Sequence, residues 1–159
     1  MALTKKTIKL KKYSDVIEEM TATAVALTPG MLLEQVAAGT CQAHSGAQLP
    51  VLSMFALEDE LQGNGIDTDF AVSATIQVWI PGRGDIVNAL LANGQTIVIG
   101  DKLVSNGDGK LKKYSAVEDE SSIGEIFYSD VIVGYAVDAV DMSGSSAADP
   151  DGRIQVRIK

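Results

Sequence analysis

The chain has 159 residues, of which 46% are hydrophobic and 21% are charged. This composition is typical of a folded chain with a real core, and it excludes an intrinsically disordered one. The formal net charge is −8, which argues against nucleic acid as a partner, because binding to a phosphate backbone needs a basic surface. The apolar runs are too short to span a membrane, and the first twenty residues lack the apolar stretch of a signal peptide. We therefore expect neither a membrane partner nor export, and we expect the single Cys41 to pack as a small hydrophobe.

Residues 1–14 are predicted to form an extended basic arm. Five of the thirteen basic residues lie in the first twelve positions, which contain no acidic residue. Apolar and basic residues alternate over Thr7–Lys11, so one face could add a strand to a neighbouring sheet while the lysines meet carboxylates. The alternative is a disordered terminus that only improves solubility. The residues predicted to dock are Lys5, Lys6, Ile8, Lys9, Leu10, Lys11 and Lys12.

The body of the chain, residues 15–159, is predicted to be a single domain made mostly of strands. Thr21–Val25 is rich in residues tolerated in strands, and Pro29-Gly30 forms a turn. A hairpin is predicted over residues 31–45 and a second one over residues 102–114, where Asn106-Gly107-Asp108-Gly109 supplies the residues that adopt positive φ. Residues 85–91 also have the spacing of a helical face, but the threonine-rich segment that matches them favours a strand.

Alternation along Ile76–Ile80 puts Gln77 and Trp79 on the face opposite to the apolar side chains. The similar strand at the C-terminus puts Gln155 and Arg157 on the corresponding face. Trp79 and Arg157 are therefore candidate interface residues, since both residue types are enriched at interface hot spots. The alternative for Trp79 is that a loop or the arm of its own chain covers it.

Residues 15–80 and 85–158 are predicted to be two tandem, pseudo-symmetric copies of one unit. An offset of seventy aligns Asp15-Val16-Ile17 with Asp85-Ile86-Val87, Gly30 with Gly100, Leu33 with Leu103 and Gly39 with Gly109. After an insertion in the second copy, Ile76–Ile80 aligns with Ile154–Ile158. Short strands, frequent turn glycines and a duplicated unit predict a mainly all-β fold, an antiparallel barrel in which each copy covers open edges of the other.

The matched positions are apolar residues, turn glycines and one serine, so the duplication is interpreted as architectural. His44 is the only histidine and is matched by Tyr114, which indicates a packing or surface role. Asp67-x-Asp69 lacks the further ligands of a calcium loop, and Arg83-Gly84-Asp85 lies at the junction between the copies, where a turn is expected. No Walker loop or dinucleotide fingerprint is present. We therefore predict no catalytic residue, no metal site, no cofactor and no enzyme activity.

Three stretches of the chain are similar to one known family. They are Met54–Gly63 followed by Gly65-Ile66-Asp67, then Val78–Pro81 with Arg83-Gly84-Asp85, and the ending from Ser143 through Asp149-Pro150 to Arg157. The chain resembles the head decoration, or capsid cement, proteins of tailed bacteriophages. The resemblance covers most of residues 22–158, and the arm matches least, so its docking role depends on its charge.

The resemblance implies a homotrimer that is made in the host cytoplasm and binds the outer surface of an expanded phage head. There it would hold neighbouring copies of the major capsid protein together and stabilise the head. One alternative is a glycan- or host-surface-binding module displayed on a virion. Another is a small trimeric β-barrel enzyme of the dUTPase type, although residues 154–158 read as a strand where that class needs a glycine-rich phosphate loop.

Overall fold

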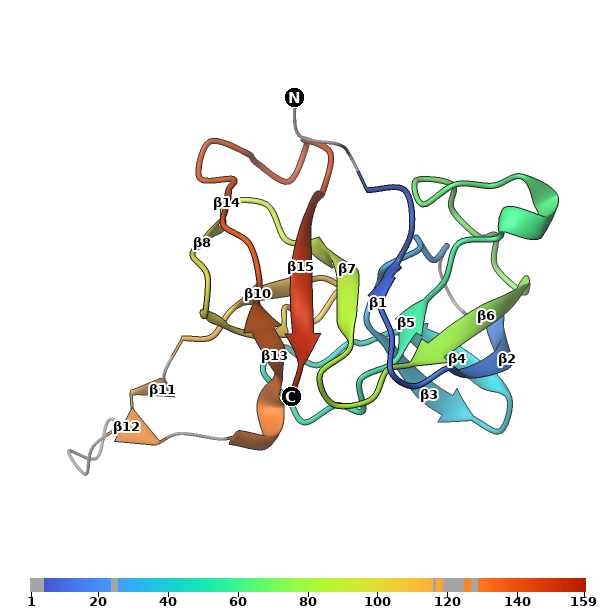
Figure 1. The fold of residues 1–159 in the computed structure, drawn as a ribbon, viewed down its shortest axis with the longest axis horizontal. Coiled ribbons are helices and arrows are strands. Elements are labelled where there is room, and N and C mark those ends of the chain that lie inside the picture. Colours follow the sequence, from blue (N-terminus) through green and yellow to red (C-terminus); the bar gives the residue numbers. More distant parts are fainter. Residues whose placement is uncertain (1–4, 24–25, 116, 119–124, 127–128) are drawn as a thin grey trace.

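The computed structural model describes residues 5–23, 26–115, 117–118, 125–126 and 129–159. The fold is almost entirely β, as predicted, and two five-stranded barrels lie side by side (Figure 1). The prediction of one antiparallel barrel built jointly from both copies is wrong, because the strands of each copy pair within their own barrel, and each barrel includes one parallel strand pair. The described helical segments are two single turns of 3-10 helix, η1 (Glu60–Gln62) and η2 (Ser129–Val131). Of the strand predicted for Thr21–Val25, the last two residues lie outside the described part of the chain.

The first barrel contains residues of the N-terminal half. Its strands are β2 (Val16–Ala22), β3 (Leu33–Ala37), β4 (Thr40–Ala43), β5 (Phe55–Ala56) and β6 (Thr75–Ile80). They pair in the order β3-β4-β2-β6-β5, and a bridge between Leu32 and Phe55 links the two ends of this sheet. The β3–β4 hairpin turns at Gly39, whose φ of 69° is the positive value that its tight turn requires.

The second barrel is closed. It consists of β7 (Ile86–Leu91), β9 (Lys102–Ser105), β10 (Leu111–Lys113), β13 (Ile132–Ala136) and β15 (Gly152–Ile158). The order is β7-β10-β9-β13-β15, and β15 pairs back with β7 over six residues of each strand. Closure leaves no open sheet edge within the barrel. The remaining strands are β1 (Lys9–Lys11), β8 (Thr96–Ile97), β11 (Val117–Glu118), β12 (Glu125–Ile126) and β14 (Val140–Asp141).

The strand prediction for residues 85–91 is confirmed by β7. All six residues of β7 are buried, because the strand has neighbouring chain on both of its faces. A strand buried on both faces loses the alternation of apolar and polar residues that identifies a half-exposed strand. This loss explains why a helical face was an alternative for the segment.

The hydrogen-bonded ladders of the two barrels correspond. Gln35 pairs with Cys41 as Ser105 pairs with Leu111, and Ala56 pairs with Val78 as Ala136 pairs with Val156. The parallel pairing of β2 with β4 has its counterpart in the parallel pairing of β7 with β10. These ladders agree with the predicted duplication, and the duplication itself stays a prediction.

One part of the predicted alignment is wrong by a residue. Thr21 pairs with Thr75, and Leu90 pairs with Arg153, which is the matching position of the second barrel. Strand β2 therefore matches β7 at an offset of sixty-nine instead of seventy. The physical reason is side-chain alternation, because a shift of one residue would turn Met20 and its counterpart Ala89 away from the cores that they help to form.

Two apolar clusters hold the barrels together. The interior of the first barrel forms one cluster, with Met20, Ala22, Leu33, Cys41, Met54, Ala56, Ile76 and Val78 among its members. The second cluster fills the second barrel and extends to Leu32, Phe55, Leu57, Ile66 and Trp79 of the N-terminal half. Cys41 is fully buried, and burial raises the pKa of its thiol. Its predicted role as a small packed hydrophobe is confirmed.

Candidate interaction surface

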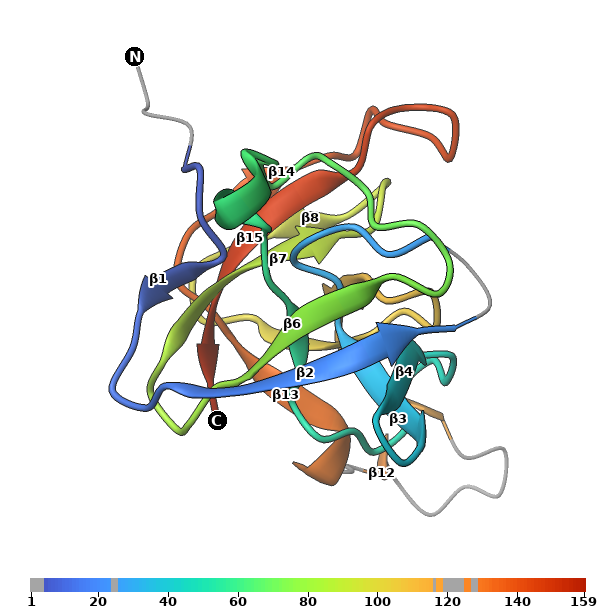
Figure 2. The same cartoon turned by 90° about the vertical axis from the view of Figure 1, so that its right-hand side faces the viewer.

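The N-terminal arm is a strand of the chain's own sheet. Strand β1 runs antiparallel to the start of β7, with an irregularity between Lys9 and Lys11. The backbone N–H of Asn88 donates to the carbonyl of Ile8 at 2.9 Å, and its side-chain Nδ2 donates to the carbonyl of Thr7 at 3.3 Å. Figure 2 shows β1 and β2 on the side that faces the viewer, joined by a short connection. The arm thus has a fixed position next to the barrels.

A buried carboxylate fastens the arm. Glu58 lies just after β5 and accepts hydrogen bonds from the Ile8 N–H at 3.2 and 3.3 Å and from the Thr7 hydroxyl. The side chain of Ile8 is fully buried in the cluster of the second barrel. The prediction that Ile8 docks on another protein is therefore wrong for this conformation, because its apolar surface is already covered by its own chain.

The arm lysines differ in how much of their charge is available. Lys9 and Lys12 both form ion pairs with Asp15, at 3.7 Å for Lys9. The hydrogen bond from Lys12 is the main reason why the pKa of Asp15 lies below its usual value. Lys5, Lys6 and Lys11 are exposed, whereas Leu10 is partly buried. Lys5, Lys6 and Lys11 are thus the exposed arm lysines outside these ion pairs.

Exposed apolar side chains follow these lysines along the chain. Tyr13 is 69% exposed, Val16 48% and Ile17 37%. The ammonium of Lys11 lies 5.1 Å from the centre of the Tyr13 ring, within the range of a cation–π contact. The group formed by Lys5, Lys6, Lys11, Tyr13, Val16 and Ile17 is called the arm surface below. The sequence analysis did not identify its apolar residues. The adjacent Val16 and Ile17 at the start of a strand could have indicated them, since one of two neighbouring strand residues faces away from the core.

Asp85 holds the junction between the barrels. Its side chain is fully buried and accepts hydrogen bonds from the backbone N–H of Tyr13 at 2.5 Å and of Gly82 at 2.8 Å. Arg83-Gly84-Asp85 thus lies in a turn, as predicted. Its carboxylate is buried, so the tripeptide is not an exposed adhesion loop.

Trp79 points out of its own barrel, as alternation predicts, but it is fully buried. Its Nε1 donates to the carbonyl of Ser14 at 3.3 Å, and its ring belongs to the cluster of the second barrel. The prediction that Trp79 is an exposed interface residue is wrong, because the other barrel and the end of the arm cover it. Arg157, at the matching position of the second barrel, is exposed and remains available for contacts.

His44 lies in a polar cluster that has the composition of a catalytic triad. Its Nδ1 lies 2.7 Å from Oγ of Ser105, and its Nε2 lies 3.8 Å from a carboxylate oxygen of Glu34. Burial raises the pKa of Glu34, but hydrogen bonds from Gln42 and Ser45 outweigh this effect and lower it. His44 and Glu34 also line a depression of about 260 Å³.

The geometry of this cluster suits packing better than nucleophilic catalysis. Ser105 is fully buried, and its Oγ also accepts a hydrogen bond from the N–H of Gly107 at 3.1 Å. A substrate carbonyl would have to approach within van der Waals contact of that oxygen, and Ser105 has no exposed surface at which it could do so. The cluster instead ties the turn after β9 to the end of β4.

Ser105→Ala is expected to lower the free energy of unfolding by about 1–3 kcal/mol, because His44 and the Gly107 N–H lose a buried partner. Urea unfolding checks this value, with Ser53→Ala on a partly exposed loop as the matched control. Folded protein is also expected to resist labelling by a fluorophosphonate serine probe. Stoichiometric labelling of Ser105, read by mass spectrometry, would contradict the packing role.

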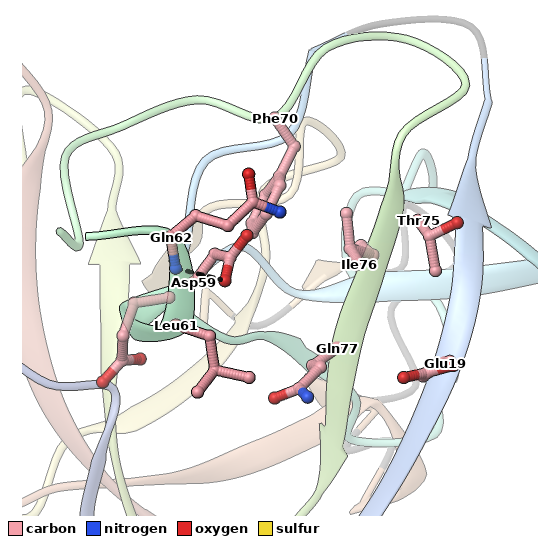
Figure 3. Close-up of a pocket in the computed structure, with 9 residues that line it drawn as sticks. Glu19, Asp59, Leu61, Gln62, Phe70, Thr75, Ile76 and Gln77 are labelled. Atoms are coloured by element: carbon pink, nitrogen blue, oxygen red, sulfur yellow. Dashed lines mark hydrogen bonds between the residues drawn. The ribbon is translucent and has the colours of Figure 1, made fainter. Parts of the chain in front are cut away.

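A second depression, of about 250 Å³, lies beside η1. Glu19 and Gln77 line it from β2 and β6, and Asp59, Leu61 and Gln62 line the opposite side (Figure 3). Leu61 is 93% exposed, so η1 presents a single apolar side chain among acids. The sequence analysis used Met54–Gly63 only for the family resemblance. A leucine between Glu60 and a Gln-Gly turn could also have indicated an exposed apolar side chain.

Within the described residues no group of three or more His, Cys, Asp or Glu side chains could hold a metal ion. No helix in the same part of the chain is long and apolar enough to cross a membrane. No family model matches the sequence, and no curated protein matches it.

Proposed function

We propose that this chain is a structural virion protein, a decoration or cement protein that binds the outer surface of a phage capsid as a homotrimer and stabilises the head. The observation that carries the proposal is the arm surface. It combines exposed lysines with exposed apolar residues on a chain whose net charge is −8. A surface of this kind suits a partner with an acidic and apolar patch. The sequence resemblance supplies the identity of that partner, the major capsid protein.

Trimer formation and capsid binding would support each other. Three linked arm surfaces raise the effective concentration of the second and third contacts, so weak single contacts can give firm attachment. A trimer that binds the assembled shell and not free subunits favours the intact shell by mass action. At a free concentration about 100 times the Kd, this linkage is worth about 2.7 kcal/mol per site.

The test is co-sedimentation of the purified protein with undecorated, expanded heads. The double variant Lys5→Glu/Lys6→Glu is expected to bind at least about tenfold more weakly and to depend less on salt, because it reverses charge at the arm surface. Lys112→Glu/Lys159→Glu makes the same change in net charge elsewhere and is expected to bind within about twofold of the unmodified protein. Light scattering is expected to give three times the 16.7 kDa mass of the chain.

Two results would count against the proposal. A monomer at micromolar concentration would rule out the homotrimer. Absence of the unmodified protein from the sedimented heads would rule out binding to the capsid. Equal loss of binding in both double variants would show that general charge, and not the arm surface, drives attachment.

A further inference from the structure

In the part of the chain that the structure describes, strand β7 pairs with a strand, β1, that has no equivalent beside its counterpart β2. In the second barrel β7 pairs with β15 on one side, and with β10 and β1 on the other. In the first barrel β2 pairs with β6 and, at Thr21 and Ala22, with β4. No described residue pairs with the other edge of β2 over Val16–Glu19. On β7, the equivalent edge is occupied by β1.

The backbone of β2 has hydrogen-bonding groups directed at this edge. The N–H of Thr21 donates to the carbonyl of Gly39, on the side away from β6. Because the direction of N–H groups alternates along an antiparallel strand, those of Ile17 and Glu19 face the same edge. The residue on β7 that matches Glu19 is Asn88, whose N–H donates to Ile8 of the arm. The Glu19 N–H on β2 is thus equivalent to the Asn88 N–H on β7, which donates to the carbonyl of Ile8 in the arm.

The side chains at this edge indicate the chemistry of the strand that it fits. Val16 and Ile17 are 48% and 37% exposed, and Glu18 and Glu19 are also exposed. The residue on β7 that matches Glu18 is Val87, and Val87 pairs with Lys9 of the arm. A strand of the same kind on β2 would place a basic residue directly opposite a carboxylate, which is a favourable cross-strand pair.

We propose that the edge of β2 from Val16 to Glu19 is a strand-accepting site for an extended segment of a partner protein in which basic and apolar residues alternate. The segment adds antiparallel to β2, with one of its carbonyls on the Glu19 N–H and a basic side chain opposite Glu18. The arm of a second copy is not the occupant, because Ile8 is fully buried and Glu58 fastens the arm on β7. The site shares Val16 and Ile17 with the arm surface, but it is defined by the backbone edge of β2 and the charge of Glu18, and its test uses no capsid.

The test is an NMR titration of the full chain with the peptide Lys-Thr-Ile-Lys-Leu-Lys, which repeats residues 6–11 and serves as a free strand of alternating basic and apolar residues. Peptide binding is expected to slow amide exchange at Ile17 and Glu19 at least about tenfold. Glu18→Lys is expected to weaken binding at least about tenfold, and Glu19→Pro to abolish it, since proline removes an edge donor that the ladder with β6 does not use. Glu60→Lys on η1 makes the same charge change away from the edge and is the matched control, expected to bind normally.

Three outcomes would overturn the proposal. Protection confined to Ile86 and Asn88 would mean that the peptide displaces β1. Equal binding by Glu18→Lys and Glu60→Lys would mean non-specific attraction to an acidic surface. Self-association through residues 16–19 without peptide would assign the site to a second copy. Far-UV circular dichroism of Glu19→Pro shows whether it folds, and Glu18→Lys keeps the test decisive if it does not.

Discussion

Replacing Trp79 by alanine is expected to lower the free energy of unfolding by about 3–5 kcal/mol, the range for removing a large aromatic side chain from a core. The side chain is fully buried and belongs to the cluster that joins the two barrels. Its removal leaves a cavity there and leaves the carbonyl of Ser14 without its donor. Urea unfolding followed by far-UV circular dichroism measures the change, since the variant has no tryptophan fluorescence.

The second barrel offers a matched control for this experiment. Arg157→Ala changes the corresponding position on a strand of the same register, but the arginine is exposed. Its effect is expected to stay within about 0.5 kcal/mol. If both variants lost a similar free energy of unfolding, burial between the barrels would not be the reason that Trp79 stabilises the fold.

Ile8→Ala is expected to lower the free energy of unfolding by about 2–5 kcal/mol, as for other buried isoleucines. Ile8 packs in the core cluster while its backbone pairs with β7 and Glu58. Loss of the side chain weakens the attachment of the whole arm, so limited proteolysis is expected to cut sooner after Lys9 and Lys11.

Lys6→Ala is the control for the arm, because Lys6 lies two residues away and is exposed. Its effect on stability is expected to stay within about 0.5 kcal/mol. If Ile8→Ala were as stable as Lys6→Ala and equally resistant to protease, the arm would not be part of the core in solution. A deletion of residues 2–12 removes Ile8 from the core as well as the exposed lysines, so it changes stability and docking together. Charge reversal at Lys5 and Lys6 changes docking alone.

Local sequence predicted much of the fold because its signals act over short distances. Alternation correctly placed the Trp79 side chain outside its own barrel. The Asn-Gly and Asp-Gly pairs predicted the turn between β9 and β10, where Gly107 and Gly109 have φ values of 93° and 78°. The same reasoning missed the one-residue shift between β2 and β7, since the Asp-apolar-apolar similarity of their starts outweighed the pattern of inward-facing residues.

Exposure was the property that local pattern could not predict. Trp79 and Arg157 point the same way from matching strands, and only the contact between barrels decides which is covered. Ile8 was predicted to dock on a partner, but it is buried by a segment distant along the chain, beside Asn88. The edge of β2 with which no described residue pairs could not be predicted either, because a sequence can indicate a strand but not which strands lie beside it.

The sequence by itself determined that this protein is a β-barrel protein with turns at many of its glycines, an acidic body and a basic N-terminus. Alternation, turn chemistry and charge are properties of neighbouring residues, so they can be read without coordinates. Only the tertiary structure decided which face of each strand meets solvent, that β1 belongs to the second barrel's sheet, and that no described residue pairs with the outer edge of Val16–Glu19. Those properties depend on contacts between residues dozens of positions apart, and burial of apolar surface in such contacts selects among arrangements that the local pattern leaves equal.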